Sequence, residues 1–302
     1  MKTERRAPAK VNLFLHMAGR REDGYHLLYS CMQTISVFDE ISVEIDPVKD
    51  GEKGEVILVS DSGRLPADPE KNTAVAAARR FLRKAGEENR RVTIRLVKNI
   101  PSEAGLGGGS SDAATVLLAL DELLPGKVSR QELAEIALSI GADVPFFLCG
   151  GTVLCEGVGE ILSPMPALSG IPMLLLKPPA GVSTPYCYKE WDKTGSECIS
   201  EQEKAQLKKD LQDMEDPASH LQELCRSWSN DLEGPAVASV SEIRDGIDSL
   251  IENGARFAAM SGSGSAVFGL FEDEETRDQA RNSQSIQSLI EKGWWVQTAE
   301  TI

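Results

Sequence analysis

The sequence predicts an α+β protein built in two parts. Short segments with strand-like alternation recur through residues 11–96, and a glycine-rich loop then leads into an apolar helical segment. Two prolines, Pro164 and Pro166, mark a linker, and after them the pattern of short strands and helices begins again. We therefore expect one domain over residues 1–165 and a second over residues 166–302.

The first domain is expected to begin with strands. Alternating apolar residues predict strands at residues 11–17, 26–37, 41–45, 56–59 and 92–96. Residues 21–24, Arg-Glu-Asp-Gly, carry a hairpin turn signal between the first two strands. Apolar residues at helical spacing predict a helix over residues 72–85, and the last strand leads into the glycine-rich loop.

The rest of the chain alternates helices with shorter strands. Ser129 suits a helix N-cap and Gly141 a helix end, whereas residues 155–160 are typical of a turn. Pro217 is expected to break a long polar segment, to which we assign no function. Helices are expected at residues 111–124, 129–140, 200–232, 241–253 and 274–291, and strands at 173–176, 267–271 and 294–298.

The composition is that of an acidic globular protein. The chain has 302 residues, 41% hydrophobic and 26% charged, with a formal net charge of −15. Such a charge argues against nucleic acid and against an anionic membrane as the main partner. A phosphate-bearing ligand would therefore need positive charge gathered locally, from helix N-termini and a few placed lysines.

Cysteine and histidine usage points to an intracellular protein without a structural metal. The six cysteines contain no C-x-x-C pair and are expected to be reduced, partly buried thiols. The three histidines are not at metal-ligand spacing, so no metal-ligating residues are predicted. The sequence shows neither a signal peptide nor a membrane-length apolar segment, and we expect a cytoplasmic protein.

The strongest functional signal is the run Gly-Leu-Gly-Gly-Gly-Ser-Ser at residues 105–111, which precedes an apolar helix. Glycines allow a ligand to approach the backbone closely, and a helix N-terminus offers free N–H groups, so the run predicts an anion site, most simply for phosphate. It is neither a Walker A sequence nor a G-x-G-x-x-G fingerprint, which disfavours a doubly wound nucleotide fold. The alternative is a flexible loop ahead of a core helix.

Four other features carry polar or aromatic side chains of interest. Lys10 and Asn12 share one face of a strand, either toward a site or toward solvent. Asp143 stands before a short segment that begins with proline, as a helix cap or as a functional carboxylate. Residues 261–265, Ser-Gly-Ser-Gly-Ser, read on their own as a tight turn. Exposed loop aromatics that could stack on a nucleobase, or simply pack, are Tyr25, Tyr186 and Tyr188.

The order of these motifs resembles that of the GHMP kinase superfamily. Pro-Ala-Lys-Val-Asn-Leu-Phe-Leu at residues 8–15, the glycine run at 105–111 and the loop at 261–265 match its three motifs. Asp-Gly-Tyr-His at 23–26, Gly-Ala-Asp-Val-Pro at 141–145 and Glu-Gly-Val-Gly-Glu at 156–160 resemble the members that phosphorylate a cytidine-diphosphate-linked methylerythritol. The resemblance spans nearly the whole chain. It implies an N-terminal mixed sheet with helices and a C-terminal ferredoxin-like α/β sandwich.

The resemblance also implies an activity and a role for each matching residue. It implies an ATP-dependent kinase of non-mevalonate isoprenoid synthesis that uses ATP and Mg²⁺, with Asp143 as catalytic base and Lys10 beside it. The implied nucleotide-binding residues are Asn72, Lys98, Pro101, Ala104, Gly105, Leu106, Gly107, Gly108, Gly109, Ser110 and Ser111. Among these, the run at 105–111 would wrap the ATP phosphates, and Asn72 and Lys98 would line the adenosine pocket. The implied substrate-binding residues are Asn12, Tyr25, His26, Tyr188, Lys189 and Gly262. A monomer or homodimer is expected.

Two other readings compete with this one. Another GHMP kinase, acting on homoserine or a mevalonate derivative, would not need Tyr25, His26 and Tyr188 to clamp a cytosine. A non-catalytic nucleotide-binding protein on the same fold would keep the glycine run but would not need both Lys10 and Asp143.

Overall fold

The computed structural model contains both predicted classes of element and describes residues 1–48, 53–60, 71–213 and 221–302. It divides into two compact units whose segments alternate along the chain. The first unit consists of Met1–Ala9, Val37–Ser102 and Gly107–Cys149, and the second of Lys10–Ser36, Glu103–Leu106 and Gly150–Ile302. Residues 150–165 group with the second unit, so the compact units do not divide at residue 165. As a boundary between family domains, that position stays a prediction.

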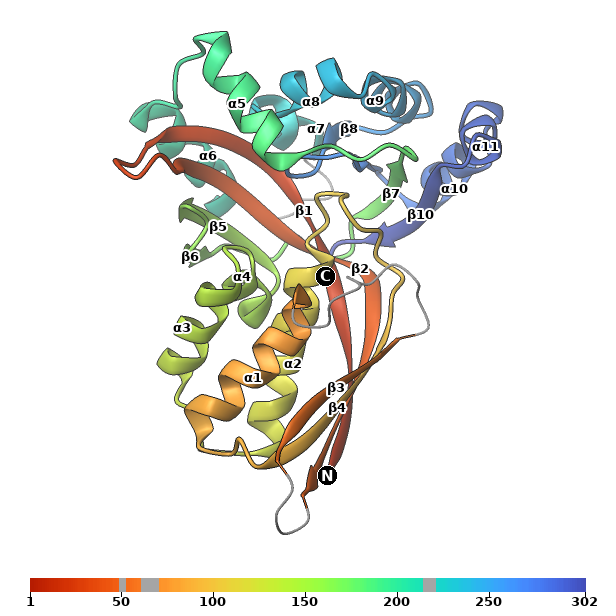
Figure 1. The fold of residues 1–302 in the computed structure, drawn as a ribbon. Coiled ribbons are helices and arrows are strands. Elements are labelled where there is room, and N and C mark those ends of the chain that lie inside the picture. The colour runs from red at the N-terminus through yellow and green to blue at the C-terminus, as the bar shows by residue number, and fades with distance from the viewer. Residues whose placement is uncertain (49–52, 61–70, 214–220) are drawn as a thin grey trace. The chain divides into compact units, whose positions relative to one another are not determined.

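The first unit packs helices against strands (Figure 1). Its strands are parts of β1 (Lys2–Arg20) and β2 (His26–Pro47) with β3 (Glu55–Ser60) and β4 (Arg90–Val97), and its helices are α1 (Thr73–Ala85), α2 (Gly108–Leu123), α3 (Arg130–Ile140) and α4 (Val144–Cys149). Strand β4 pairs in parallel with β3 and antiparallel with the end of β2. Helix α2 contacts all three other helices, and most of its surface is buried, as its apolar sequence predicts.

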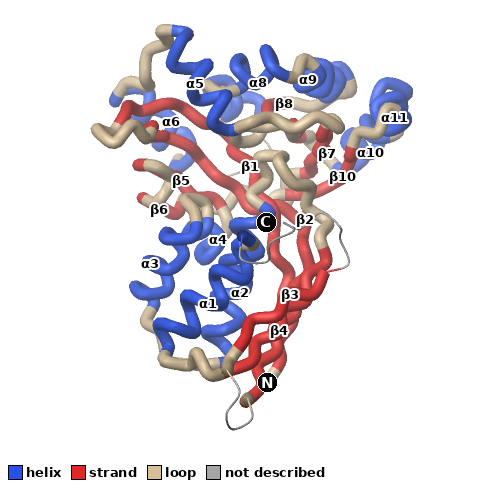
Figure 2. Tube along the Cα trace, in the orientation of Figure 1, coloured by secondary structure: helices blue, strands red, loops and turns tan. Residues whose placement is uncertain are grey.

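The second unit contains a four-stranded antiparallel sheet in the order β10-β7-β9-β8. In chain order this is 4-1-3-2, and helices connect the first strand to the second and the third to the fourth, which is the predicted ferredoxin-like arrangement (Figure 2). Its elements are the remaining parts of β1 and β2 with β5 (Thr152–Gly157), β6 (Ile161–Pro164), β7 (Pro172–Lys177), α5 (Thr184–Thr194), α6 (Glu201–Gln212), α7 (Leu221–Leu224), the 3₁₀ helix η2 (Cys225–Ser227), α8 (Glu233–Ser239), α9 (Glu242–Glu252), β8 (Phe257–Met260), β9 (Val267–Leu270), α10 (Glu274–Arg281), α11 (Gln284–Glu291) and β10 (Trp295–Glu300).

Several predicted elements have different bounds in the structure. The strand expected at 11–17 is longer at both ends, because β1 extends from Lys2 to Arg20. The strands expected at 26–37 and 41–45 are one continuous strand, β2, because the intervening Asp39 is buried and paired rather than a break. The single helix expected at 274–291 is two helices, α10 and α11. The Ser283 side chain accepts a hydrogen bond from the Ile286 N–H and begins the second helix.

Other local expectations differ in the second unit. Residues 155–157 end β5 instead of forming a turn, and the turn follows at 158–160. Helices α5 and α8 and strands β6 and β8 were not predicted, and β6 ends at Pro164, where a linker was expected. The long helix expected at 200–232 is divided into α6, α7 and η2, and Pro217 lies outside the described residues.

The cysteines are free thiols in two kinds of surroundings. Cys149 and Cys198 are exposed, and the others are buried. Burial raises the pKa of the Cys187 thiol to about 11 and that of Cys31 well above its ordinary value. The buried thiols are therefore packing residues with little thiolate character.

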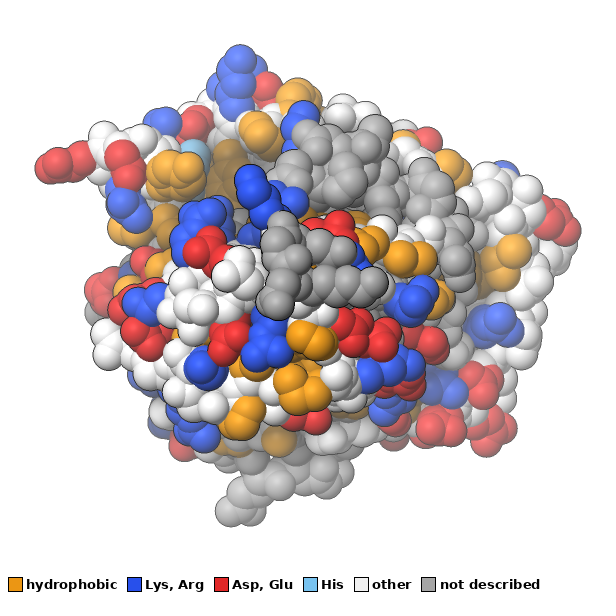
Figure 3. Space-filling view, turned by 60° about the horizontal axis from the view of Figure 1, so that its bottom comes forward, with side chains coloured by type: hydrophobic (Ala, Val, Ile, Leu, Met, Phe, Trp, Pro, Cys, Tyr) orange, Lys and Arg blue, Asp and Glu red, His pale blue; other side chains and the backbone are white. Residues whose placement is uncertain are grey.

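Charged side chains of both signs cover the surface. Figure 3 shows Lys and Arg side chains interspersed with Asp and Glu across the described part of the face in view, rather than gathered in one patch. None of the helices in the described ranges combines the length and apolar character needed to cross a bilayer.

Candidate functional site

The second unit holds Lys10 and Asn12 inside the protein. Both lie on β1 and are only 3% and 2% exposed, so the solvent-facing alternative is wrong. The Lys10 ammonium donates to Asn12 Oδ1, and Asn12 Nδ2 donates to Ser30 Oγ at 2.8 Å. Because the Ser30 hydroxyl donates onward to the Phe14 carbonyl at 2.7 Å, the amide of Asn12 has a fixed orientation.

The loop at residues 261–265 contacts both Asn12 and the start of the glycine run. Ser261 Oγ accepts a hydrogen bond from the Asn12 backbone N–H at 3.2 Å and donates one to the Gly105 carbonyl at 2.9 Å. The backbone N–H of Lys10 donates to the Leu106 carbonyl at 3.0 Å. The loop is a tight turn, as its sequence predicts, but it also joins these motifs in one place.

Two glycines make this close approach possible. Gly105 has φ 73°, and a Cβ atom added to it would lie 1.9 Å from the Ser261 carbonyl oxygen. A Cβ on Gly262 would lie 3.3 Å from both the Gly105 carbonyl oxygen and Lys10 Nζ. A larger residue at either position would displace the backbone or crowd the lysine.

Asn230 supports this loop and was missed by sequence reasoning. Its Nδ2 donates to the carbonyl oxygens of Met260 and Gly262, at 2.9 and 2.7 Å. Its Oδ1 accepts from the Leu232 N–H at 3.0 Å. The residue lies in the polar segment to which no function was assigned, and no local motif marks it.

The second half of the glycine run belongs to the first unit and begins α2. Gly107 is the N-cap residue with φ 71°, and no side chain caps the helix. The first N–H groups of α2 are therefore available to a ligand. Ser111 is fully buried, and its hydroxyl has no hydrogen-bond partner among the described residues. Together these features fit an anion site better than a flexible loop.

Helix α1 and the segment before α4 lie beside this helix start. Thr73 Oγ1 donates to the Gly109 carbonyl at 2.6 Å. A Cβ atom added to Gly141 would lie 3.9 Å from Ser110 Oγ, so the Gly141–Asp143 motif is a neighbour of the glycine run within the first unit. Asp143 itself is half-buried, directly before α4.

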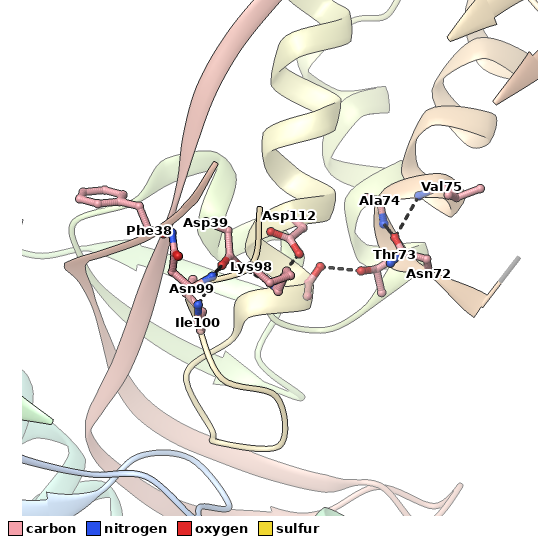
Figure 4. Close-up of polar contacts among 11 residues, drawn as sticks. Phe38, Asp39, Asn72, Thr73, Ala74, Val75, Lys98, Asn99, Ile100 and Asp112 are labelled. Atoms are coloured by element: carbon pink, nitrogen blue, oxygen red, sulfur yellow. Dashed lines mark hydrogen bonds and ion pairs between the residues drawn. The ribbon is translucent and has the colours of Figure 1, made fainter. Parts of the chain in front are cut away.

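Lys98 and Asn72 are engaged by neighbouring groups (Figure 4). The Lys98 ammonium contacts the carboxylates of Asp39 and Asp112, the latter at 2.7 Å. Asn72 is the N-cap of α1, and its Oδ1 accepts from the Ala74 and Val75 N–H groups. The acidic partners of Lys98 were not predicted.

The remaining predicted residues near the glycine run differ in exposure. Ala104 is buried, and its carbonyl accepts a hydrogen bond from the Ala266 N–H at 3.1 Å. Pro101 lies half-buried in the turn after Ile100.

The predicted aromatic residues lie in the second unit, and two of them are helical. Tyr186 and Tyr188 lie on α5 rather than in a loop. The Tyr188 ring stacks on His26 with centroids 4.9 Å apart, and Trp191 meets the edge of the same histidine.

The neighbours of this ring stack are polar and exposed. His26 Nε2 lies 2.7 Å from Asp192 Oδ1. Tyr25 is 66% exposed, and Lys189 is also exposed. Tyr25 therefore offers its ring to solvent in the hairpin turn that leads to His26.

Comparisons with known proteins agree on one family. The model of the GHMP kinases N terminal domain matches residues 72–151, and that of the GHMP kinases C terminal domain matches residues 205–284. The chain is 40% identical over 298 residues to a 4-diphosphocytidyl-2-C-methyl-D-erythritol kinase of Pelobacter propionicus, covering 98% of each.

Solved structures give the same picture. A crystal structure of 4-(cytidine 5'-diphospho)-2C-methyl-D-erythritol kinase is 36% identical, covers 98% of this chain and 99% of that one, and has a TM-score of 0.72. A homoserine kinase from Cytophaga hutchinsonii has a TM-score of 0.73 at 20% identity, covering 100% of this chain and 97% of that one, which is a likeness of fold alone.

Proposed function

The chain belongs to the 4-diphosphocytidyl-2-C-methyl-D-erythritol kinase family of GHMP kinases, and we propose that it phosphorylates the 2-hydroxyl of 4-diphosphocytidyl-2-C-methyl-D-erythritol with ATP. This reaction would supply the non-mevalonate isoprenoid precursor pathway. The observation that carries the proposal is the 40% identity over 98% of both chains. The contacts of Lys10 and Ser261 with the glycine run, and of Asn12 with Ser261, support it, because all are residues of the motifs that resemble the family.

The ATP phosphates are proposed to bind at the glycine run and the start of α2. The uncapped helix N-terminus offers backbone N–H groups and the positive end of the helix dipole. In the described residues, no three His, Cys, Asp or Glu side chains form a metal-binding group. The unpartnered hydroxyl of buried Ser111 is an oxygen donor of the kind Mg²⁺ accepts alongside phosphates. Mg²⁺ bound there would neutralise phosphate charge.

Asp143 is proposed as the base that takes the proton from the substrate hydroxyl. Phosphoryl transfer passes through a loose transition state, so positioning and charge stabilisation do most of the work, and a carboxylate is an adequate proton acceptor. Lys10 would stabilise the charge that develops on the attacking oxygen. Asn12, whose amide is oriented by Ser30, would position the methylerythritol part.

The cytidine end of the substrate is proposed to bind at the aromatic residues. Tyr25 and Tyr188 would stack on the cytosine ring and His26 would contact its polar edge, with Lys189 and Gly262 as further substrate residues. The exposed ring of Tyr25 and the stack of His26 on Tyr188 support this placement. The contact of His26 with Asp192 gives that ring a defined orientation.

The test is ADP release by the purified protein with ATP and Mg²⁺, comparing the cytidine-linked methylerythritol with homoserine and mevalonate. Selective turnover of the cytidine substrate is expected. Turnover of another alcohol would keep the kinase and discard this substrate, and ATP binding without turnover would favour a non-catalytic protein.

The same assay tests the base. Asp143→Ala should lower kcat by about 10²-fold or more, the size of effect that general-base removal gives. The exposed Asp245 on α9 provides the control, since Asp245→Ala removes an equal charge from a residue outside the predicted site residues. Near wild-type turnover in Asp143→Ala would contradict the assignment of Asp143 as the catalytic base.

A further inference from the structure

Lys98 occupies an unusual position in the first unit, because two acidic side chains from different elements enclose its ammonium group. Asp39 lies in the middle of β2 and is fully buried, and Asp112 lies in α2 with a side chain only 5% exposed. Lys98 follows directly after β4. The cluster therefore links a strand, a helix and the segment that leads to the glycine run (Figure 4).

The charges of this cluster are costly to bury. Burial raises the pKa of Asp112 to about 7, although the Lys98 ammonium opposes that shift. Burial lowers the pKa of Lys98, but the carboxylates of Asp112 and Asp39 outweigh it, and the pKa lies above its ordinary value. Replacing a buried ionic group with apolar residues is often neutral or stabilising. A cluster of this kind is therefore better explained by a functional role than by a contribution to the stability of the fold.

The surroundings of the Lys98 ammonium indicate what this functional role is. A Cβ atom added to Gly108, the first residue of α2, would lie 3.3 Å from Lys98 Nζ and 2.9 Å from Ile100 Cγ2. Asp39 Oδ1 accepts from the N–H groups of Asn99 and Ile100, at 2.6 and 2.8 Å. The carboxylate that contacts the ammonium thus also holds the turn that packs against Gly108.

We propose that Asp39 and Asp112 are positioning residues that hold the Lys98 ammonium against Gly108 and so maintain the first turn of α2 in its phosphate-binding geometry. The inference rests on the proposed function, in which that turn receives the ATP phosphates. It assigns Lys98 an action on the phosphate end of the nucleotide, not on adenosine. Asp112 is buried and contacts the Lys98 ammonium at 2.7 Å, so we expect its substitution to act on nucleotide binding through Lys98.

Electrostatics gives the cluster a second effect on the same turn. One ammonium between two carboxylates limits the negative potential that they project toward the N–H groups of α2. Without the ammonium, two buried carboxylates would face each other close to the place where an anion is expected to bind. Loss of Lys98 should therefore weaken phosphate binding both through geometry and through repulsion.

The experiment uses the full chain and two variants. Asp112→Asn keeps the size of the side chain and removes its charge. The double variant Lys98→Met with Asp112→Asn removes the ammonium and leaves only Asp39, which keeps its two backbone hydrogen bonds. The readouts are KM for ATP, kcat, KM for the alcohol substrate, and the inhibition constants of inorganic tripolyphosphate and of adenosine.

The double variant should raise KM for ATP and the inhibition constant of tripolyphosphate by about tenfold or more, the size seen when a supporting group behind a binding group is lost. Asp112→Asn should shift both in the same direction by a smaller factor, because the loss of one of the two groups that position the ammonium outweighs the removal of one negative charge near the anion. The inhibition constant of adenosine, KM for the alcohol and kcat at saturating ATP should stay within about threefold, because the lost interaction affects nucleotide binding alone. Lys84→Met, which breaks an exposed ion pair with Glu132 in the same unit, is the control and should change none of them.

Three outcomes would overturn the proposal. A lower unfolding temperature with an unchanged KM for ATP would make the cluster merely structural. Weaker adenosine binding with unchanged tripolyphosphate binding would place Lys98 at the adenosine instead. If the double variant does not fold, an unchanged tripolyphosphate constant in Asp112→Asn decides against the proposal. Calorimetric binding of tripolyphosphate to wild type separates this inference from the proposed function, since it needs no turnover.

Discussion

Two lysines that were predicted site residues, buried Lys10 and half-buried Lys98, are held in different ways. In the second unit, Lys10 contacts the amide oxygen of Asn12, and the backbone of Gly262 approaches its ammonium closely. In the first unit, Lys98 lies between two carboxylates. Around Lys10 the close approach of Gly262 leaves little room for a larger side chain, whereas around Lys98 two carboxylates and one ammonium balance charge. Substitutions should therefore fail for steric reasons in one region and for electrostatic reasons in the other.

The largest effect is expected from a single methyl group near Lys10. Gly105→Ala places a Cβ against the Ser261 carbonyl in a left-handed backbone conformation, and should lower the free energy of unfolding by about 3 kcal/mol. Gly126 has nearly the same φ, 72°, with nothing within 4 Å, so Gly126→Ala measures the conformational cost alone, about 1 kcal/mol. Urea unfolding compares the two. Equal losses would mean that close packing at Gly105 is not what constrains this region.

A smaller effect is expected from the loss of one neutral hydrogen bond in the first unit, the unit that holds the Lys98 cluster. Thr73→Val keeps the shape of the side chain and removes the hydroxyl that donates to the Gly109 carbonyl, and should cost about 1 kcal/mol of unfolding free energy. Thr73→Ser keeps the hydroxyl and is the matched variant. If both variants lose the same stability by urea unfolding, the hydrogen bond contributes nothing measurable.

The smallest effect on the free energy of unfolding is expected at Glu132, where the charge of the carboxylate can be tested without the cost of deep burial. Glu132 caps α3 through Ser129 and pairs with Lys84, and these contacts lower its pKa to about 2 although it is exposed. A lowered folded pKa adds stability above the unfolded pKa near 4.3, and this is lost as pH falls toward the folded value. Wild type should therefore exceed Glu132→Gln in urea midpoint near neutral pH, with the difference shrinking below about pH 4. A difference independent of pH would show that the carboxylate charge is not the source.

Features set by neighbouring residues could be predicted from the sequence. The cap of α3 at Ser129 and the helix that follows the glycine run both depend on short-range patterns. The division between α10 and α11 was also readable, because Asn282 and Ser283 interrupt the helical pattern with a good N-cap. Likewise, Pro185 in the first turn and Gly195 at the end mark α5.

Features set by distant pairing could not be predicted in this way. Asp39 reads as the polar end of a strand, and only Lys98, 59 residues later, makes its burial acceptable. Asn230 bonds to carbonyls 30 and 32 residues away, in a segment whose composition suggests only surface. The sequence thus identified the motif residues, while the residues that hold them in place depend on tertiary contacts.

The distribution of thiols has a practical consequence. The two exposed cysteines fall one in each compact unit, Cys149 in the first and Cys198 in the second, while the other four are buried. A maleimide dye pair would therefore react at two native positions without any substitution, since the buried thiols are shielded. Energy transfer between the dyes would then report the distance between Cys149 and Cys198, and so whether the addition of nucleotide changes the separation of the two units.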